Sequence, residues 1–349
     1  MSKANTGNFF EDYSIGQVLP HATPRTITVG DQSLYTALYG SRFALQSSSE
    51  FAKGLGFERA PIDDLLAFHV IFGKTVPDIS LNAVANLGYA QGRFFRPVFP
   101  GDTLRAISEI IGLKENSSGK TGVVYVRTVG QNQRDEIVLS YVRWVMVHKR
   151  DQASPAPETV VPELADAISM QEMAIPENVV YANANLAMSG SPHRWGNYEI
   201  GERINHLDGM TVEEAEHQLA TRLYQNTAKV HFNQHTEGEG RFGRRLVYGG
   251  HVISLARALS FNGLGNAFQI AGINGGTHVS PLFAGDTVYA WSEVLDKAEI
   301  EGRPGMGALR LRLVALKNQA PAEFPHKDAD GKYDPSVILD FDYWVLMPR

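Results

Sequence analysis

The chain has 349 residues and a formal net charge of −6, enough length for two ordinary domains that each bury a core. It is 43% hydrophobic and 20% charged, as globular proteins are, and it has no cysteine, which excludes disulfides and thiolate metal sites. A pI near 6.0 without basic runs disfavours nucleic acid as a partner. The sequence offers no membrane-spanning window and no signal-peptide core at its start. We therefore expect a cytoplasmic enzyme that acts on a small molecule and has no membrane partner.

Two long parts of the sequence repeat one another. Tyr13-Ser-Ile-Gly16 returns as Tyr198-Glu-Ile-Gly201, a shift of 185, and Arg96–Leu104 matches Ser280–Val288 at a shift of 184. Both copies end on a tryptophan strand, around Trp144 and Trp344, at a shift of 200. The larger last shift predicts an insertion in the second copy, in the polar segment Lys317–Pro335. Matching order at a nearly constant offset indicates a duplicated unit.

Each copy predicts one long apolar helix followed by a run of strands. The helices are expected at Leu65–Phe72 and Val252–Phe261, with Asn262-Gly263 ending the second. Leu309–Leu313 alternates apolar and charged residues, which is typical of a half-buried strand. This order predicts an α+β fold with each antiparallel sheet wrapped on its helix. The expected divisions are an N-terminal domain at 1–150, a Pro- and Ala-rich ordered crossing linker at 151–195, and a C-terminal domain at 196–349.

A Gly-Asp-Thr turn precedes a long strand in both copies. Asp102 and Asp286 follow a glycine in these turns, before the strands that begin near Thr103 and Thr287. Aspartate commonly caps such turns through its carboxylate. We therefore expect both carboxylates to be turn-capping groups rather than acids in a site.

One stretch of the second copy carries the residues with the clearest chemical role. Asn226 and His231 lie five positions apart, and Gly249-Gly250 opens the predicted helix. Backbone N–H groups at a helix start are unpaired and carry the positive end of the helix dipole. Glycine lets a substrate oxygen approach them closely, so this pattern favours an imidazole base facing an oxyanion hole. The alternative interpretation is a structural histidine beside a simple Gly-Gly turn.

His231 and His235 are also spaced as two metal ligands on one helix face would be. No third ligand stands at a suitable spacing, and no glutamate lies between the two histidines. We therefore expect no metal.

These residues resemble a known family. The helix-in-sheet unit with its Gly-Asp-Thr turn is similar to the hot-dog fold, and the segment ending in His231, followed by Leu246-Val-Tyr-Gly249, resembles the motif of the MaoC-like (R)-specific enoyl-CoA hydratases. The duplication resembles the tandem, or double, hot-dog form of that family. Over nearly the full chain, the resemblance implies reversible hydration of mesaconyl-CoA to β-methylmalyl-CoA. It further implies no cofactor, because coenzyme A is part of the acyl-CoA substrate, and assembly into a homo-oligomer.

The resemblance also assigns roles to residues. His231 occupies the position of the family's catalytic histidine, and Gly249 that of the backbone N–H which holds the thioester carbonyl. Tyr248 replaces the histidine that usually precedes this glycine, and Asn226 replaces the catalytic acid. At the shift of 185, the corresponding positions of the first copy are Ser41, Gln46, Asp63 and Asp64. They offer neither an imidazole nor a glycine, so we expect the first copy to be inactive.

The exchange of the acid for Asn226 leaves several mechanisms open, because an amide cannot ionise. His231 could transfer protons alone while Asn226 positions water or thioester, which is the interpretation we prefer. A carboxylate from Glu237, Glu239 or Asp63 could join it instead. Two other functions remain as alternatives: a protein that binds acyl-CoA without turnover, and a thioesterase.

A dicarboxylic acyl-CoA carries a free carboxylate that needs a cation if it is buried. Arg257 falls two turns beyond Gly250 on the predicted helix and is the expected partner. Further candidates for contacts with the substrate or the CoA phosphates are Arg244, Arg245, Lys229, His235, Arg93, Arg96 and Lys53.

Overall fold

The structure, a computed structural model, describes residues 3–349. Within this range the strands form one ten-stranded sheet in the order β1-β3-β4-β5-β2-β7-β10-β9-β8-β6, with every neighbouring pair antiparallel. The strands are β1 (Val18–Thr26), β2 (Ala83–Phe94), β3 (Thr103–Glu115), β4 (Thr121–Gln131), β5 (Ile137–His148), β6 (Arg203–Thr211), β7 (Gln269–His278), β8 (Thr287–Glu299), β9 (Met306–Lys317) and β10 (Val337–Pro348).

The strand order of the N-terminal half, β1–β5, is repeated by that of the C-terminal half, β6–β10, about the centre of the sheet. The two halves join through β2 and β7, where Tyr89 pairs with Gly276 and Arg93 pairs with Gly272. The repeat seen in the sequence is thus a repeat of topology. Residues from both halves meet at this seam.

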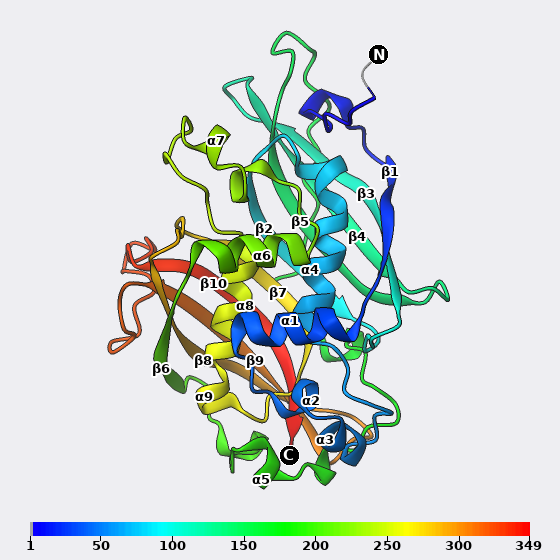
Figure 1. Ribbon diagram of the computed structural model, residues 1–349, viewed down its shortest axis with the longest axis vertical. Coiled ribbons are helices and arrows are strands. Elements are labelled where there is room, and N and C mark those ends of the chain that lie inside the picture. The colour runs from blue at the N-terminus through cyan, green and yellow to red at the C-terminus, as the bar shows by residue number, and fades with distance from the viewer. Residues whose placement is uncertain (1–2) are drawn as a thin grey trace.

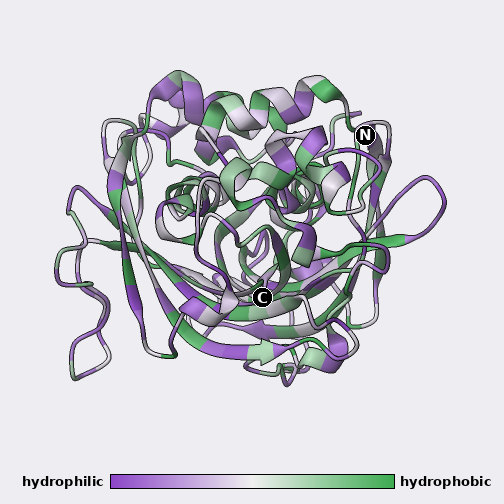
Figure 2. Ribbon diagram, turned by 90° about the horizontal axis from the view of Figure 1, so that it is seen from below, coloured by the Kyte–Doolittle hydropathy of each residue, from purple (hydrophilic) through white to green (hydrophobic). Residues whose placement is uncertain are grey.

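The sheet is strongly curved, and its concave face holds the long helices (Figures 1 and 2). The central helix of each half, α4 or α8, is buried along almost its whole length, and both contribute to one large apolar cluster together with the inner faces of the strands. This confirms the α+β prediction of a sheet wrapped on helices. The helices are α1 (Val29–Tyr39), α2 (Ala44–Ser47), α3 (Ser49–Gly54), α4 (Asp64–Thr75), α5 (Leu186–Ser189), α6 (Glu214–Leu223), α7 (Gln234–Glu237), α8 (Gly249–Leu259) and α9 (Phe261–Leu264).

The two central helices begin differently. The side chain of Asp63 accepts the backbone N–H of Leu65 at 2.9 Å and so caps α4. Tyr248 stands at the equivalent position before α8, and its side chain caps nothing. The amide of His251 bonds the carbonyl of Tyr248 at 2.9 Å, so those of Gly249 and Gly250 are the first-turn amides without a side-chain cap in the described chain.

The predicted turns and helix end are confirmed. Asp102 accepts the backbone N–H of Phe99 at 2.9 Å, and Asp286 accepts that of Phe283 at 3.0 Å, so both carboxylates cap turns. After α8 the backbone leaves helical geometry at 262–263, where Gly263 has a φ of 107°.

The segment 151–195 crosses between the halves along the outside of the sheet. Val160 forms an isolated antiparallel bridge with Leu113, and Ile168 and Tyr181 are buried in an apolar cluster with Phe268. Throughout residues 3–349, the helices are too short or too polar to span a bilayer.

Candidate active site

A cavity of about 460 Å³, the central cavity below, lies where the two halves meet. The C-terminal half supplies the segment 226–231, the start of α8 and the end of β7. The N-terminal half supplies the end of α4, the start of β2 and two residues of β5, Arg143 and Met146. No aspartate or glutamate is among the residues that line the cavity in the described chain. Any acid–base chemistry here must use groups other than carboxylates.

His231 lines the cavity and is held in one orientation. Its Nδ1 lies 2.9 Å from the carbonyl oxygen of Leu246, and since a carbonyl can only accept, Nδ1–H is the donor. Nε2 then carries the lone pair of the neutral ring. Burial lowers the pKa of His231 to about 4, against the smaller opposing effect of the bond to Leu246. At neutral pH His231 is therefore an unprotonated base.

Asn226 lines the same cavity and is 5% exposed. Its Oδ1 accepts the backbone N–H of Ala228 at 3.0 Å, which fixes the turn that leads to His231. This bond leaves the amide NH₂ group as the donor available to the cavity. The expected positioning role of Asn226 is compatible with this arrangement.

The start of α8 presents one of its two glycines to the cavity. Gly249 is among the lining residues, whereas Gly250 is not. A Cβ on Gly250 would lie 2.3 Å from the ring of Tyr248 and 2.6 Å from that of His69, so this glycine serves close packing. The ring of Tyr248 stands edge-on to that of His231, with centroids 5.4 Å apart. The imidazole and the uncapped helix start are thus neighbours.

A second imidazole, which sequence reasoning missed, lies against Gly249. A Cβ at Gly249 would be 2.4 Å from Cε1 of His278, at the end of β7. His278 Nε2 is 3.2 Å from the hydroxyl of Tyr89, and both residues line the cavity. Burial lowers the pKa of His278 to about 4. No short motif marks His278, because β7 meets β2 only through the fold.

Arg143, on β5, was also missed by sequence reasoning. It is fully buried, lines the cavity and lies over the ring of Phe72 at 4.2 Å. The signal was present: Arg143 shares the inward face of an apolar strand with Tyr141 and Val145.

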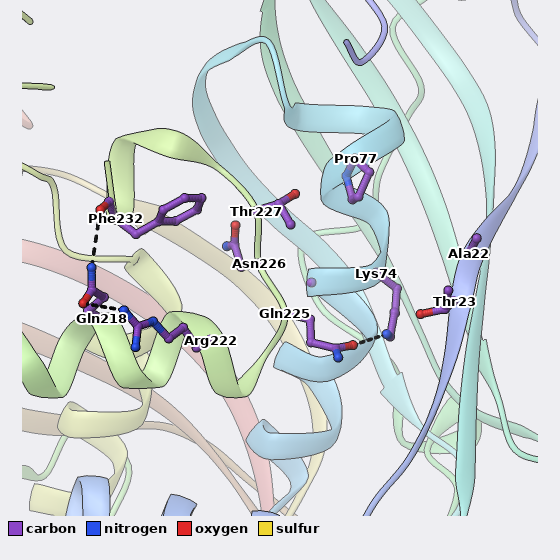
Figure 3. A pocket seen from close by; sticks show the side chains of 11 residues that line it. Ala22, Thr23, Lys74, Pro77, Gln218, Arg222, Gln225, Asn226, Thr227 and Phe232 are labelled. Carbon is purple, nitrogen blue, oxygen red and sulfur yellow. Dashed lines mark hydrogen bonds between the residues drawn. The ribbon is translucent and has the colours of Figure 1, made fainter. Parts of the chain in front are cut away.

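Asn226 also lines a second, open cleft of about 560 Å³ (Figure 3). Lys74 and Gln225 point toward one another there and form a hydrogen bond. Arg222, on α6, adds a second cation, and no carboxylate is among the cleft's lining residues in the described chain. Burial, with a smaller contribution from the charge of Arg25, lowers the pKa of Lys74 to about 8. The cleft is suited to anionic groups.

The structure corrects the expectation for Arg257. This side chain is not part of the cavity lining; its guanidinium binds Ala267 O and Ser260 Oγ and lies 3.6 Å from the ring centroid of Phe43. The charge of Arg257 lowers the pKa of Asp63 against the larger effect of burial.

Asp63 likewise lies outside the cavity, because its carboxylate caps α4. Burial raises the pKa of Asp63 and raises that of Asp64 to about 8. Asp64 accepts the backbone N–H of Ile270 at 2.8 Å, and the amide of Gln46 donates to Phe268 O at 2.9 Å. These side chains are engaged in contacts within the protein at the position that mirrors the central cavity.

The remaining expected contacts do not lie in the central cavity. His235 is exposed on α7, and Arg245 forms an ion pair with Glu214. Of the carboxylates considered as partners of His231, neither Glu237 nor Glu239 lines the cavity. The other cations are also outside the lining: Arg244, Lys229, Arg93, Arg96 and Lys53.

Comparison with known proteins gives the family. Residues 1–325 match the family model described as mesaconyl-CoA hydratase. A β-methylmalyl-CoA dehydratase of Chloroflexus aurantiacus is 65% identical over 100% of this chain and 99% of its own length, and a mesaconyl-CoA hydratase of Cereibacter sphaeroides is 62% identical over 99% and 100%. A solved structure of a MaoC domain dehydratase from Chloroflexus aurantiacus superposes with a TM-score of 0.98 at 65% identity, covering 100% of this chain and 99% of that one. A Mycobacterium tuberculosis protein described as a double hot-dog superposes at 0.73 with 24% identity over 99% of both chains, which confirms the predicted fold. The chain belongs to the mesaconyl-CoA hydratase family.

Proposed function

We propose that this protein adds water reversibly to mesaconyl-CoA to give β-methylmalyl-CoA, with His231 as the proton-transfer group. The observation that carries the proposal is the pairing of His231 and Gly249 in one cavity without carboxylates. The names of the relatives that match over the full chain support the substrate. A thioesterase is disfavoured, since a hydrolytic carboxylate is missing from the lining within residues 3–349.

In the proposed reaction the thioester carbonyl oxygen accepts the backbone N–H of Gly249. Nε2 of His231 removes a proton from water while the oxygen bonds to Cβ, and the π electrons move through Cα to form the enolate. The helix start stabilises the negative charge on the enolate oxygen. The imidazolium then returns its proton to Cα, which leaves the hydroxyl on Cβ and restores neutral His231. Dehydration follows the same steps in reverse.

Asn226 takes the positioning role in this scheme. Its Oδ1 is already occupied by Ala228, so its NH₂ group can donate to the attacking water or to the thioester. The depressed pKa of His231 keeps the ring neutral without a neighbouring acid. We assign the CoA arm to the open cleft with Lys74 and Arg222, because that cleft shares Asn226 with the central cavity (Figure 3).

The test is hydration of mesaconyl-CoA, followed by the mass of the product. Wild type should form β-methylmalyl-CoA, and His231→Ala should lower kcat by about 100- to 10 000-fold, the usual contribution of a general acid–base group. His235→Ala, an exposed histidine outside the cavity, is the matched control and should keep wild-type rates. Wild-type rates in His231→Ala would disprove the mechanism. Absence of turnover by wild type would disprove the function.

A further inference from the structure

Arg143 is a buried cation that has no counter-ion within the described residues. Its Nη2 donates to Thr75 Oγ1 at 2.8 Å and to Ser80 Oγ at 3.3 Å, while Nε and Nη1 have no hydrogen-bond partner among the residues that the structure describes. No carboxylate forms an ion pair with it among residues 3–349. Burying a charge in this state is strongly unfavourable, so the position calls for an anion that the folded chain does not supply.

The groups around Arg143 are donors too. The hydroxyls of Tyr141 and Tyr248 are buried and lack a hydrogen-bond partner in the described part of the chain. Both tyrosines, and Tyr89, lie near enough for the charge of Arg143 to affect their ionisation. Arg143 and Tyr248 both line the cavity, and a guanidinium with a phenolic O–H group forms a good complement to a carboxylate, whose two oxygens accept several hydrogen bonds.

We propose that Arg143, assisted by the Tyr248 hydroxyl, binds the free carboxylate of the substrate and makes the cavity specific for dicarboxylic acyl-CoA thioesters; this inference rests on the proposed function. In mesaconyl-CoA the carboxylate is attached to Cβ, the carbon that receives water. Arg143, Gly249 and His231 line the same cavity, so carboxylate, thioester oxygen and attacking water each have a partner there. Held at both ends, Cβ stays facing the imidazole.

Other arginines of the region do not offer this site. Arg241 also lines the cavity but is exposed, and its guanidinium lies over Phe242. Arg257 is buried, but it lies outside the lining and is bonded to the chain itself. Alignment of Trp144 with Trp344 places Tyr343, not an arginine, opposite Arg143 in the other half. Of these positions, Arg143 is therefore the one that brings a buried guanidinium without an ion-pair partner to the central cavity.

The experiment compares mesaconyl-CoA with tiglyl-CoA, in which a methyl group replaces the free carboxylate and the rest of the acyl chain is unchanged. The readout is the ratio of the two kcat/KM values. Arg143→Met should lower this ratio by about 100-fold, as expected for loss of a buried charge-assisted contact. Arg143→Lys keeps the charge but not the planar fork and should lower the ratio by about 10-fold. Arg257→Met, the matched buried arginine, should leave the ratio as in wild type.

A binding measurement separates this inference from the hydratase function. Calorimetry with succinyl-CoA and butyryl-CoA, which cannot be hydrated, should show wild type preferring the dicarboxylic ligand by about 100-fold. Loss of that preference in Arg143→Met supports the carboxylate site even if mesaconyl-CoA is not turned over. A ratio that Arg143→Met leaves unchanged, or a wild type without preference, overturns it. The wild-type comparison decides the matter should Arg143→Met fail to fold.

Discussion

The hydroxyl groups of Tyr39 and Tyr224 lie 2.6 Å apart, and the two residues are separated by 185 positions, the shift of the internal repeat. Tyr39 ends α1 and Tyr224 follows α6, so equivalent helix ends of the two halves touch. The Tyr39 hydroxyl also bonds Nδ1 of His251 at 3.0 Å. This fully buried contact joins the halves on the helix side, as β2 and β7 join them on the sheet side.

Removing one hydroxyl of this pair should destabilise the fold unequally. Tyr224→Phe loses one hydrogen bond, about 1 kcal/mol, whereas Tyr39→Phe leaves both Tyr224 and His251 unsatisfied and should cost about 2–3 kcal/mol. The midpoint of urea unfolding measures both. Tyr125→Phe, at a half-buried position on β4 outside this contact, is the control. Equal effects of all three substitutions would contradict the assignment.

Buried neutral histidines should make the protein less stable in acid. Burial lowers the pKa of His69 to about 3 and that of His206 to about 4, below the ordinary value near 6.5. Above pH 6.5 these histidines are neutral in both the folded and the unfolded chain, and their contribution to stability is fully present. Below pH 6.5 the histidines of the unfolded chain become protonated, whereas the buried rings of the folded chain stay neutral down to about pH 4. Each residue should remove on the order of 1–2 kcal/mol by pH 5.

Thermal unfolding from pH 8 to pH 4.5 measures this effect. His206→Gln can keep contacts to Asn262 and Ser292 without titrating, so its Tm should depend less on pH than that of wild type. His235→Gln, on an exposed position, should follow wild type. Identical pH slopes for wild type and His206→Gln would show that burial of this ring has no such role.

The sequence repeat carried much information about the fold. A shift of 185 relates Asp63 to Tyr248 and Tyr39 to Tyr224, and local periodicity located α8. His231, Asn226 and Gly249 do line one cavity, because they lie close in the chain around a single helix start. A short sequence pattern is therefore sufficient to predict site residues that lie close together in the chain.

Residues contributed by the facing half could not be placed this way. Arg143 and Tyr89 reach the cavity only because β2 pairs with β7, a contact between distant segments that a repeat within each half does not specify. The position of Arg257 on α8 predicts a contact with the substrate, but its guanidinium lies outside the cavity lining and binds Ala267 O and Ser260 Oγ. Sequence distance from Gly250 was a poor guide to the direction of that side chain.

Asn226→Asp should change the pH profile more than the fold. An aspartate can still accept the N–H of Ala228, but its negative charge favours the protonated imidazole and raises the pKa of His231 from about 4. The ring must be neutral to act as a base, so the acid limb of kcat/KM should move upward by about one to two pH units. Wild type should remain active down to about pH 4–5 in short assays. An unshifted acid limb in Asn226→Asp would show that the group titrating in the profile is not His231.

The last prediction concerns the helix start itself. A Cβ at Gly249 would lie 2.4–2.8 Å from three atoms of the His278 ring, a distance that forces either the imidazole or the helix start to move. Since the Gly249 amide is the proposed donor to the enolate, Gly249→Ala should lower kcat by about 100-fold, the usual cost of losing one oxyanion donor, with a smaller change in KM. Gly196→Ala, where an added Cβ meets nothing within 4 Å, is the matched control and should keep the wild-type rate. If the clash with the His278 ring causes the loss, the double variant with His278→Ala, which removes that ring, should recover kcat to the level of His278→Ala alone; a double variant as slow as Gly249→Ala would show that the added methyl group acts by another route. Full activity in Gly249→Ala itself would place the oxyanion donor elsewhere.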